Sequence, residues 1–424
     1  AVAVYIPKLE LVNKNNYFSI VRHKEFMKVL VLNSGSSSIK YALFNMCTQL
    51  AQVTGVIERI AESGSAHKYQ YSSGGIEQKQ ATSLAIHDHQ QGLQAVFAIL
   101  SELAFIQDVS DLLCIGHRVV HGGEKFCQPT LIDSAVLAEI KKMIPLAPLH
   151  NPANITGIEA AMAYAQSVPQ VAVFDTAFHQ TMPDTAFLYA VPSQWYTEQG
   201  VRRYGFHGTS HFYVAKQAAQ YLDKPLNKLN LITLHLGNGA SMAAIASGKS
   251  IDTTMGMTPL EGLMMGTRSG DLDPAIIFYL SRTLGLTQNE IDNALNKQSG
   301  LKGVCGENDM RAVHKMADEG DKQAQLALAM YSYRIKKYIG AYTAVLGGVD
   351  ALVFTGGIGE HDTWLREQCC SELSVLGIAF DAEKNQQLKG DLSEINQAGS
   401  LVKVLVIATN EELEIAQQAE CCVK

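Results

Sequence analysis

The residues with the clearest chemical potential are two arginines in apolar, glycine-rich surroundings. Arg118 stands in GHRVVHGGEKF (116–126) and Arg268 in MGTRSGDLDP. A guanidinium that leaves water needs a fixed anion, because burying it without a partner is costly. For Arg118 that anion is either an internal carboxylate or a bound carboxylate or phosphate. Asp271 and Asp273 could hold Arg268 in place, or the two arginines could together clamp a bound anion.

One aspartate and several histidines accompany the arginines. Asp175 follows an apolar run in VAVFDTAFH, which ends at His179; His150 stands in PLHNP, and His207 and His211 belong to GFHGTSH. Catalytic groups of open α/β sheets lie at strand ends, and a carboxylate there suits Mg²⁺ if phosphates are near. Each histidine alone is more often structural, and the sequence has no HExxH spacing for zinc. If phosphates lie near it, Asp175 therefore suits a magnesium ion better than a proton relay.

Three glycine-rich turns follow apolar runs and could bind phosphate. Residues 27–44 and 230–246 each predict strand, turn and strand, with turns SGSSS and GNGAS, and residues 351–361 predict a strand followed by TGGIGEH. Such turns present backbone N–H groups and hydroxyls to an anion, and Lys40 adds a positive charge beside the first turn. No GxxxxGK[ST] occurs in the sequence, which disfavours P-loop kinases. The first two copies lie about half a chain apart, which indicates duplicated domains.

The elements between these turns indicate an α/β fold. Helical patterns cover 133–143, 152–166 and 323–344, and a strand at 401–409 precedes a helix at 411–419. Strands that alternate with helices are typical of α/β proteins. The length of 424 residues suggests two or three domains.

The composition excludes several classes of protein. Hydrophobic residues make up 47% and charged residues 18% of the chain, which rules out disorder. The net charge of −7 argues against a nucleic-acid partner, and no apolar run approaches the roughly 18 residues of a membrane span. Eight cysteines without CxxC or metal spacing, and no secretory signal, indicate reduced, mostly buried thiols in a cytoplasmic protein. Residues 1–26 read as an N-terminal extension ahead of MKVLVLNSGSSSIK and are left out of the fold argument.

Nine motifs resemble, in order, those of the acetate kinases, in the acetate/propionate/butyrate kinase group of the actin-like ATPase superfamily. They are NSGSSSIK, GHRVVHGG, PLHNP, FDTAFH, YGFHGTSH, LHLGNGAS, MGTRSGDLDP, GGIGEH and TNEEL. The resemblance implies two actin-like (ribonuclease H-like) domains, each a mixed sheet flanked by helices, around a central cleft. The first domain would take 27–178 plus 410–424. The second would take 179–409 and carry the nucleotide and dimer contacts.

The resemblance also implies reversible, Mg²⁺-dependent transfer of the ATP γ-phosphoryl to acetate, giving acetyl phosphate and ADP. Mn²⁺ could replace Mg²⁺, and the enzyme would be a cytoplasmic homodimer without a membrane or nucleic-acid partner. The catalytic residues would be Asp175, His207, Arg268, Arg118 and His150. The acetate pocket would comprise Arg118, Val120, Leu149, Phe206 and Pro259. The nucleotide would contact His235, Leu236, Gly237, Asn238, Gly239, Asp309, Met310, Arg311, Gly357, Ile358, Gly359, Glu360, His361 and Lys40, and the metal would contact Asn33, Glu411 and Asp175.

Within this resemblance, Arg118 and Arg268 would orient the carboxylate and the transferring phosphoryl, and His207 would donate to that phosphoryl. The nearest alternative is the same chemistry on propionate, since one methylene in an apolar pocket discriminates by only about 1–3 kcal/mol; the bulk of Val120 favours acetate. A non-catalytic actin-like nucleotide-binding protein would lack these arginines and acids, and a sugar kinase would need a hydroxyl-reading site. His361 stands where many relatives carry Asn. Glu411 is chosen as the metal ligand over its neighbour Glu412 by motif position alone.

Overall fold

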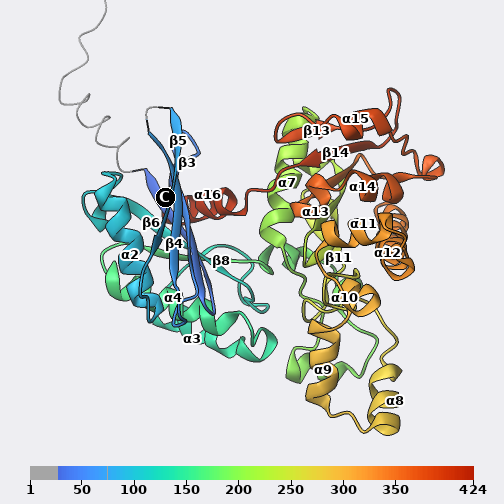
Figure 1. Cartoon of the computed structure of the whole chain (residues 1–424), viewed down its shortest axis with the longest axis horizontal. Helices are drawn as coiled ribbons and strands as arrows, with labels where there is room; N and C mark the ends of the chain where they lie inside the picture. Colours follow the sequence, from blue (N-terminus) through green and yellow to red (C-terminus); the bar gives the residue numbers. More distant parts are fainter. Residues whose placement is uncertain (1–26, 74) are drawn as a thin grey trace, which may run out of the picture.

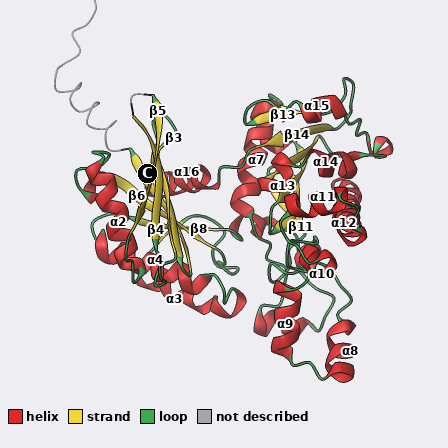
Figure 2. Ribbon diagram, viewed as in Figure 1, coloured by secondary structure: helices red, strands yellow, loops and turns green. Residues whose placement is uncertain are grey.

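A computed structural model describes residues 27–73 and 75–424 and shows two lobes, each built on one β-sheet (Figure 1). The extension expected at 1–26 lies outside the described residues. The first lobe contains an eight-stranded sheet and the second a six-stranded sheet. Helices flank each sheet (Figure 2). The predicted α/β class, with two mixed sheets flanked by helices, is therefore confirmed.

The first sheet has the strand order 5-4-3-2-1-6-8-7. Its strands are β1 (Lys28–Gly35), β2 (Ser38–Asn45), β3 (Leu50–Glu58), β4 (Ala66–Ser73), β5 (Ile76–Ser83), β6 (Leu112–Val119), β7 (Thr130–Leu131) and β8 (Gln170–Phe174). Strand β1 pairs antiparallel with β2 and parallel with β6, and β6 pairs parallel with β8. The parallel strands β6 and β8 therefore end at the same edge of the sheet.

The second sheet repeats the core of the first. Its strands are β9 (Asn230–Leu236), β10 (Ala240–Ala246), β11 (Lys249–Thr253), β12 (Ala351–Thr355), β13 (Leu392–Glu394) and β14 (Lys403–Ile407), in the order 11-10-9-12-14-13. Strand β9 pairs antiparallel with β10 and parallel with β12, and β12 pairs parallel with β14. Both sheets thus contain three antiparallel strands followed by two parallel ones. This shared order supports the duplication expected from the two hairpin motifs.

Successive side chains of a strand point to opposite sides, and the central strands of each sheet are covered on both faces. On the first sheet, α2 (His89–Glu102) and α4 (Asn151–Tyr164) pack on one face and α16 (Glu411–Val423) on the other. On the second sheet, α12 (Lys322–Leu346) packs on one face and α7 (Gly208–Tyr221) on the other. The other helices are α3 (Ser134–Lys142), α5 (Asp184–Phe187), α6 (Ser193–Gln199), α8 (Ala275–Leu284), α9 (Gln288–Lys297), α10 (Gly300–Cys305), α11 (Met310–Asp318), α13 (Gly356–His361), α14 (Thr363–Cys370) and α15 (Ala382–Gln386), with short 3₁₀ turns at Val109–Asp111, Ile144–Leu146, Ala177–Thr181, Leu226–Lys228 and Ser374–Leu376.

The chain returns to the first lobe at its end. After β14 of the second sheet, α16 lies beside the first sheet (Figure 1), where Ile415, Ala416 and Ala419 pack against Val29 and Val31 of β1. The segment 408–410, between β14 and α16, therefore connects the two lobes. The domain boundaries at 178/179 and 409/410 stay predictions.

Two expectations differ from the structure. The turn expected after β12 is a short helix, α13, because the Glu360 carboxylate accepts hydrogen bonds from the backbone N–H groups of Gly356 (2.9 Å) and Thr409 (3.1 Å). The eight cysteines form no disulfide, but they are not mostly buried: only Cys114, Cys369 and Cys370 are. No helix in the described part of the chain is both long and apolar enough to cross a membrane.

Candidate functional site

Arg118 and Asp175 meet at the shared edge of β6 and β8. Arg118 lies near the end of β6, opposite Val173 of β8, and Asp175 is the first residue after β8. The guanidinium donates from Nε to both carboxylate oxygens (3.1 and 3.2 Å) and from Nη2 to Oδ2 (2.7 Å). Asp175 is buried, so the internal-carboxylate alternative for Arg118 is correct. Within the described chain, Nη1 of Arg118 has no protein partner, which leaves one edge of the guanidinium for a ligand.

Arg268 has no carboxylate partner among the residues that the structure describes. Its Nη1 donates to the Pro259 carbonyl at 2.6 Å, and no acid of the described residues lies within ion-pair distance. Burial lowers the pKa of Arg268, which means that its positive charge is poorly compensated. The interpretation that Asp271 and Asp273 hold Arg268 is wrong: Asp271 accepts from Tyr338 Oη (2.7 Å), and Asp273 accepts from the Ala275 N–H (2.9 Å).

The turn between β9 and β10 separates Arg268 from His207. A Cβ at Gly239 would lie 2.9 Å from Arg268 Nη2 and 3.7 Å from His207 Cε1. Only glycine lets the backbone of this turn approach both side chains so closely. The turn that we expect to bind phosphate therefore lies directly against the Arg268 guanidinium and the His207 imidazole.

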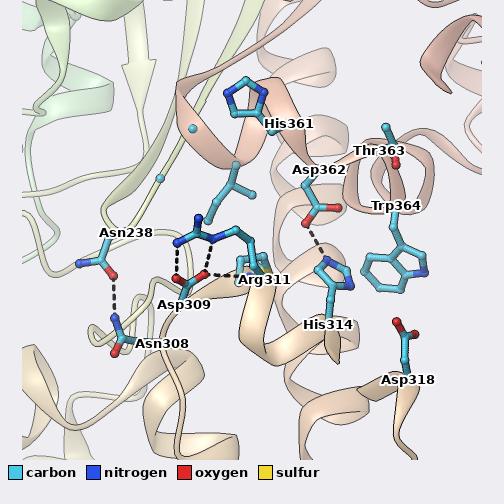
Figure 3. Close-up of a pocket in the computed structure, with 14 residues that line it drawn as sticks. Asn238, Asn308, Asp309, Arg311, His314, Asp318, His361, Asp362, Thr363 and Trp364 are labelled. Carbon is cyan, nitrogen blue, oxygen red and sulfur yellow. Dashed lines mark hydrogen bonds and ion pairs between the residues drawn. The ribbon is translucent and has the colours of Figure 1, made fainter. Parts of the chain in front are cut away.

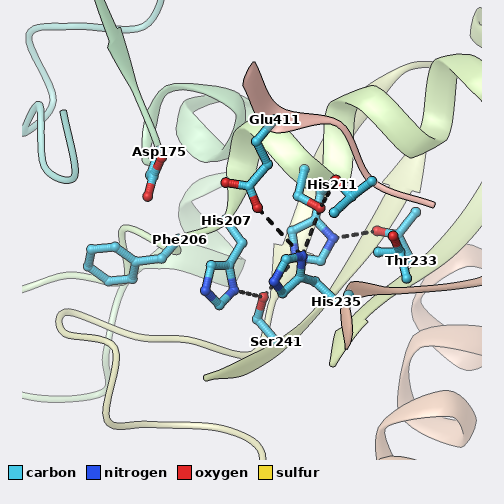
Figure 4. Close-up of polar contacts among 12 residues, drawn as sticks. Asp175, Phe206, His207, His211, Thr233, His235, Ser241 and Glu411 are labelled. Atoms are coloured by element: carbon cyan, nitrogen blue, oxygen red, sulfur yellow. Dashed lines mark hydrogen bonds and ion pairs between the residues drawn. The ribbon is translucent and has the colours of Figure 1, made fainter. Parts of the chain in front are cut away.

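His207 belongs to a group of linked imidazoles at the start of α7 (Figure 4). His207 Nδ1 lies 2.9 Å from Ser241 Oγ, and the same oxygen lies 2.8 Å from His211 Nε2. The His207 ring stacks on the His235 ring, with centroids 4.3 Å apart. Burial, followed by the charges of His235 and His211, holds the pKa of His207 well below its usual value. His207 is therefore neutral at pH 7 and carries a single ring N–H.

The other two histidines of the motifs have different surroundings. His179 is fully buried and bonded to Ser250 Oγ (2.8 Å) and the Phe206 carbonyl (2.9 Å), which is a structural role. His150 is exposed at the start of α4. Desolvation and then the charge of Arg118 lower the pKa of His150, which favours its neutral form.

Of the predicted metal ligands, Asp175 is bonded to Arg118, and Glu411 lies beside the histidine group. Its Oε1 is 3.9 Å from His235 Nδ1 (Figure 4), and burial raises its pKa to about 7 while Arg118 opposes that rise. Glu412 instead lines a separate groove of about 690 Å³ with Lys40. Asn33 pairs with Lys40 across β1 and β2. Across the described residues, no three His, Cys, Asp or Glu side chains are grouped as metal ligands.

The residues expected around acetate are only partly brought together. Val120 and Phe206 are buried in the same apolar cluster. Pro259 is half-buried and linked to Arg268 through its carbonyl. Leu149 is 64% exposed and does not join the cluster.

A cavity of about 770 Å³ in the second lobe holds most residues expected at the nucleotide (Figure 3). The predicted residues that line it are Gly237, Asn238, Asp309, Met310, Arg311, Gly357, Ile358 and His361. Reasoning from the sequence missed further lining residues: Asn308, His314, Asp318, Asp362, Thr363 and Trp364. His314 Nε2 lies 2.8 Å from Asp362 Oδ2, and this hydrogen bond raises the pKa of His314. The position of Trp364 just after GGIGEH, as one of only two tryptophans, was a signal that could have found it.

Six predicted nucleotide residues do not line this cavity. Leu236 and Gly359 are buried, and the Glu360 carboxylate is taken by backbone N–H groups at the foot of α13. Lys40 lies in the groove beside Glu412. His235 and Gly239 belong to the group around His207 and Arg268.

Comparisons with known proteins agree with this architecture. The Acetokinase family pattern matches residues 28–417. The acetate kinase of Sulfurovum sp. (strain NBC37-1) is 55% identical over 398 residues, which are 94% of this chain and 99% of that protein. The crystal structure of Porphyromonas gingivalis acetate kinase has 44% identity and a TM-score of 0.88 over 94% of this chain and 100% of its own. That of a propionate kinase from Francisella tularensis subsp. tularensis SCHU S4 has 45% identity and a TM-score of 0.87, with coverage of 93% and 99%. The chain belongs to the acetokinase family.

Proposed function

We propose that this enzyme transfers the γ-phosphoryl group of ATP reversibly to acetate, giving acetyl phosphate and ADP. The observation that carries the proposal is Arg268, a largely buried guanidinium without a carboxylate partner among the described residues. It lies beside the turn of Gly239 and near His207, and Gly237 and Asn238 of the same turn line the cavity of the second lobe. A poorly compensated cation in this place fits a bound anion.

The chemistry needs charge neutralisation more than proton transfer. Acetate is ionised at pH 7, so it attacks phosphorus without a general base. The repulsion between a carboxylate and ATP must be reduced, and Arg118 Nη1, Arg268 Nη2 and an N–H of His207 can supply donors to the oxygens of the transferring group. A single donor that acts in the transition state is worth about 10²–10³ in rate. In this scheme His150 contacts the phosphoryl region. The transfer is direct and in line and needs no general base, so Asp175 positions Arg118 instead of accepting a proton.

The acids of the site fit a divalent cation. Mg²⁺ keeps several waters and takes one or two carboxylates together with substrate phosphates. Asp175 and Glu411 would supply these carboxylates and Asn33 an amide oxygen. Burial raises the pKa of Glu411 to about 7, and a bound cation would favour its ionised form. Bound Mg²⁺, or Mn²⁺, would offset the negative charge of the phosphates. Glu411 is preferred over Glu412, which faces the separate groove.

ATP would occupy the cavity of the second lobe. Met310 and Ile358 offer apolar surface for a base, and Gly237 and Asn238 begin the turn that leads to Arg268. The phosphates would then point from the cavity toward His207. This orientation accounts for both the cavity and the free arginine.

Propionate is the second candidate substrate, because one similar structure is titled a propionate kinase. Val120 is buried beside Phe206, so its side chain limits the apolar space. We expect Val120→Ala to raise kcat/KM for propionate relative to acetate by about tenfold, at the scale of one methylene. An unchanged ratio would remove Val120 from the substrate pocket.

We also propose a cytoplasmic homodimer. Helices α8 and α12 of the second lobe carry exposed aromatic side chains, Phe278 (61% exposed), Tyr279 (59%) and Tyr333 (65%). Such surface is typical of a protein interface. Analytical ultracentrifugation should give a dimer for the wild type and a monomer for Phe278→Glu combined with Tyr333→Glu. The absence of disulfides among eight cysteines suits a reducing compartment.

The activity is tested by trapping acyl phosphate with hydroxylamine in the presence of Mg²⁺, ATP and acetate, propionate or butyrate. Acetate should lead in kcat/KM, Arg268→Ala should lose at least about 10²-fold, and the exposed Arg59→Ala should match the wild type. No acyl phosphate from any of the three acids would overturn the proposal.

A further inference from the structure

The hydrogen bonds behind His207 form a chain of four side chains. His207 Nδ1 lies 2.9 Å from Ser241 Oγ, Ser241 Oγ lies 2.8 Å from His211 Nε2, and His211 Nδ1 lies 2.7 Å from Thr233 Oγ1 (Figure 4). Ser241 is on β10, His211 on α7 and Thr233 on β9. Ser241, His211 and Thr233 are all fully buried, so water does not satisfy their polar groups. The proton positions in this chain must therefore be mutually consistent.

Two consistent arrangements exist, because the Ser241 hydroxyl has one proton and touches two imidazoles. In the first, Ser241 donates to His207 Nδ1 and accepts from His211 Nε2–H, so that neutral His207 carries its proton on Nε2. In the second, His207 Nδ1–H donates to Ser241, which donates to His211, and His207 Nε2 presents only a lone pair. The two arrangements have opposite consequences, since an N–H attracts an anionic phosphoryl and a lone pair repels it.

Thr233 distinguishes the two arrangements. In the described structure its hydroxyl contacts no polar group other than His211 Nδ1. In the first arrangement the Thr233 proton is donated to Nδ1. In the second arrangement, His211 Nδ1 already carries a proton, and the buried Thr233 hydroxyl has no acceptor. Buried donors without acceptors are costly and rare, so the geometry selects the first arrangement.

We propose that Thr233, His211 and Ser241 are positioning residues that hold His207 with its proton on Nε2, as a donor for the transferring phosphoryl group. The proposal rests on the proposed function, in which His207 faces the phosphoryl. His207 Nε2 has no other partner in the described part of the chain, which leaves it available. No proton is consumed, because a neutral imidazole acts here only as a hydrogen-bond donor.

The tautomer is measured on the wild-type enzyme, without any activity assay. Protein labelled with ¹⁵N-histidine gives two-bond ¹H–¹⁵N correlations that distinguish Nε2–H from Nδ1–H imidazoles, and His207→Asn identifies the His207 signals by their loss. We expect the Nε2–H pattern for His207 and for His211. An Nδ1–H pattern for His207 would overturn the proposal even if the enzyme is fully active, so this result is separable from failure of the proposed function.

Kinetics test whether the chain acts through His207. Ser241→Ala should lower kcat about tenfold, with little change in the KM for either substrate. This loss is part of the rate factor of about 10²–10³ that one hydrogen-bond donor contributes in the transition state. Ser241→Thr, which keeps the hydroxyl, should recover most of this loss. In the His207→Asn background, Ser241→Ala should have almost no further effect. Equal effects of Ser241→Ala in both backgrounds would show a merely structural role and overturn the proposal.

A gentler variant covers the case in which Ser241→Ala does not fold. Thr233→Val keeps the shape of the side chain and removes only the hydroxyl, and it should lower kcat about two- to threefold by allowing both tautomers. The matched control is Thr253→Val on β11, which removes a buried hydroxyl that donates to the Met242 carbonyl (2.9 Å) outside the chain. The control should leave kcat unchanged at an equal loss of Tm. Equal kcat values for the two variants would count against the proposal.

Discussion

Removal of Arg118 should destabilise the protein as well as inactivate it, because this arginine neutralises a buried carboxylate. Asp175 has a side chain only 2% exposed and receives three hydrogen bonds from Arg118, whose side chain is 22% exposed. The carboxylate is also the main reason that the pKa of Arg118 is raised. In Arg118→Ala, Asp175 remains in a buried position without its cation.

The magnitude follows from this geometry. Breaking a buried ion pair by removing one partner costs about 3–5 kcal/mol. Because Arg118 is partly exposed, water can enter the site in the variant, so we expect about 3 kcal/mol. A cooperative unit of about 150–250 residues loses about 2–4 °C in Tm per kcal/mol, so Tm should fall by about 6–12 °C.

Differential scanning calorimetry without ligands checks the expectation. The matched control is Lys79→Ala, which removes an exposed pair with Glu77 (3.7 Å) and should cost less than about 1 kcal/mol. Asp175→Asn combined with Arg118→Ala should recover part of the loss, since the unpaired charge is gone. If Arg118→Ala and Lys79→Ala show the same Tm, the pair contributes nothing to folding, and the argument from burial is refuted.

Three further predictions concern pH and packing. Burial lowers the pKa of His117 and His179 to about 4, against about 6.5 in the unfolded chain. Their contribution to stability is therefore complete above pH 6.5 and is lost as pH falls toward 4. The urea midpoint of unfolding should drop across this range, and His117→Gln should make the midpoint depend less steeply on pH. Asp362 raises the pKa of His314, so the stability that this pair contributes is complete below pH 6.5 and disappears as pH rises through the raised pKa. Asp362→Asn should therefore lower Tm more at pH 5.5 than at pH 8.5. An equal loss of Tm at both pH values would contradict the role given to this pair. Gly157→Ala would bring a Cβ into steric conflict with Ser34 Oγ and should reduce both Tm and activity. Gly340→Ala in α12, where an added Cβ would meet no atom within 4 Å, should stabilise the protein by about 0.5–1 kcal/mol. Calorimetry of both variants distinguishes steric conflict from helix propensity.

The sequence predicted the sheets better than the partners of the charged residues. Apolar runs bounded by glycine are local signals, and both hairpins occur at the expected residues. The partner of Arg118 depends on the parallel pairing of β6 with β8, which brings together Arg118 and Asp175, 57 positions apart in the sequence. No local pattern determines that pairing, which is why the internal carboxylate remained one of two alternatives. The same limit applies to Asp271, which binds Tyr338 rather than Arg268 because α12 returns over that loop.

The nucleotide cavity shows a second limit. The glycine turns were visible because glycine is required where backbones approach closely, as at Gly239 beside Arg268. His314 and Trp364, by contrast, have ordinary helical neighbours, and they reach the cavity only because α11 and α14 converge there. Sequence patterns therefore locate the glycine turns beside the cavity and miss side chains that line the cavity by tertiary packing alone.

In the proposed function the two lobes would supply different halves of the chemistry, and this division would have a consequence for catalysis. Arg118 and Asp175 come from the first sheet, and Glu411 begins the helix that packs on it; Arg268 and His207 belong to the segment that surrounds the second sheet. The spacing between the two groups is therefore set by the arrangement of the lobes rather than by either lobe alone. Leu149 is 64% exposed, so the proposed acetate pocket would be incomplete in this arrangement. Closure of the lobes would bury Leu149 and bring the two arginines together only when both substrates are bound, and this coupling would protect ATP from transfer to water.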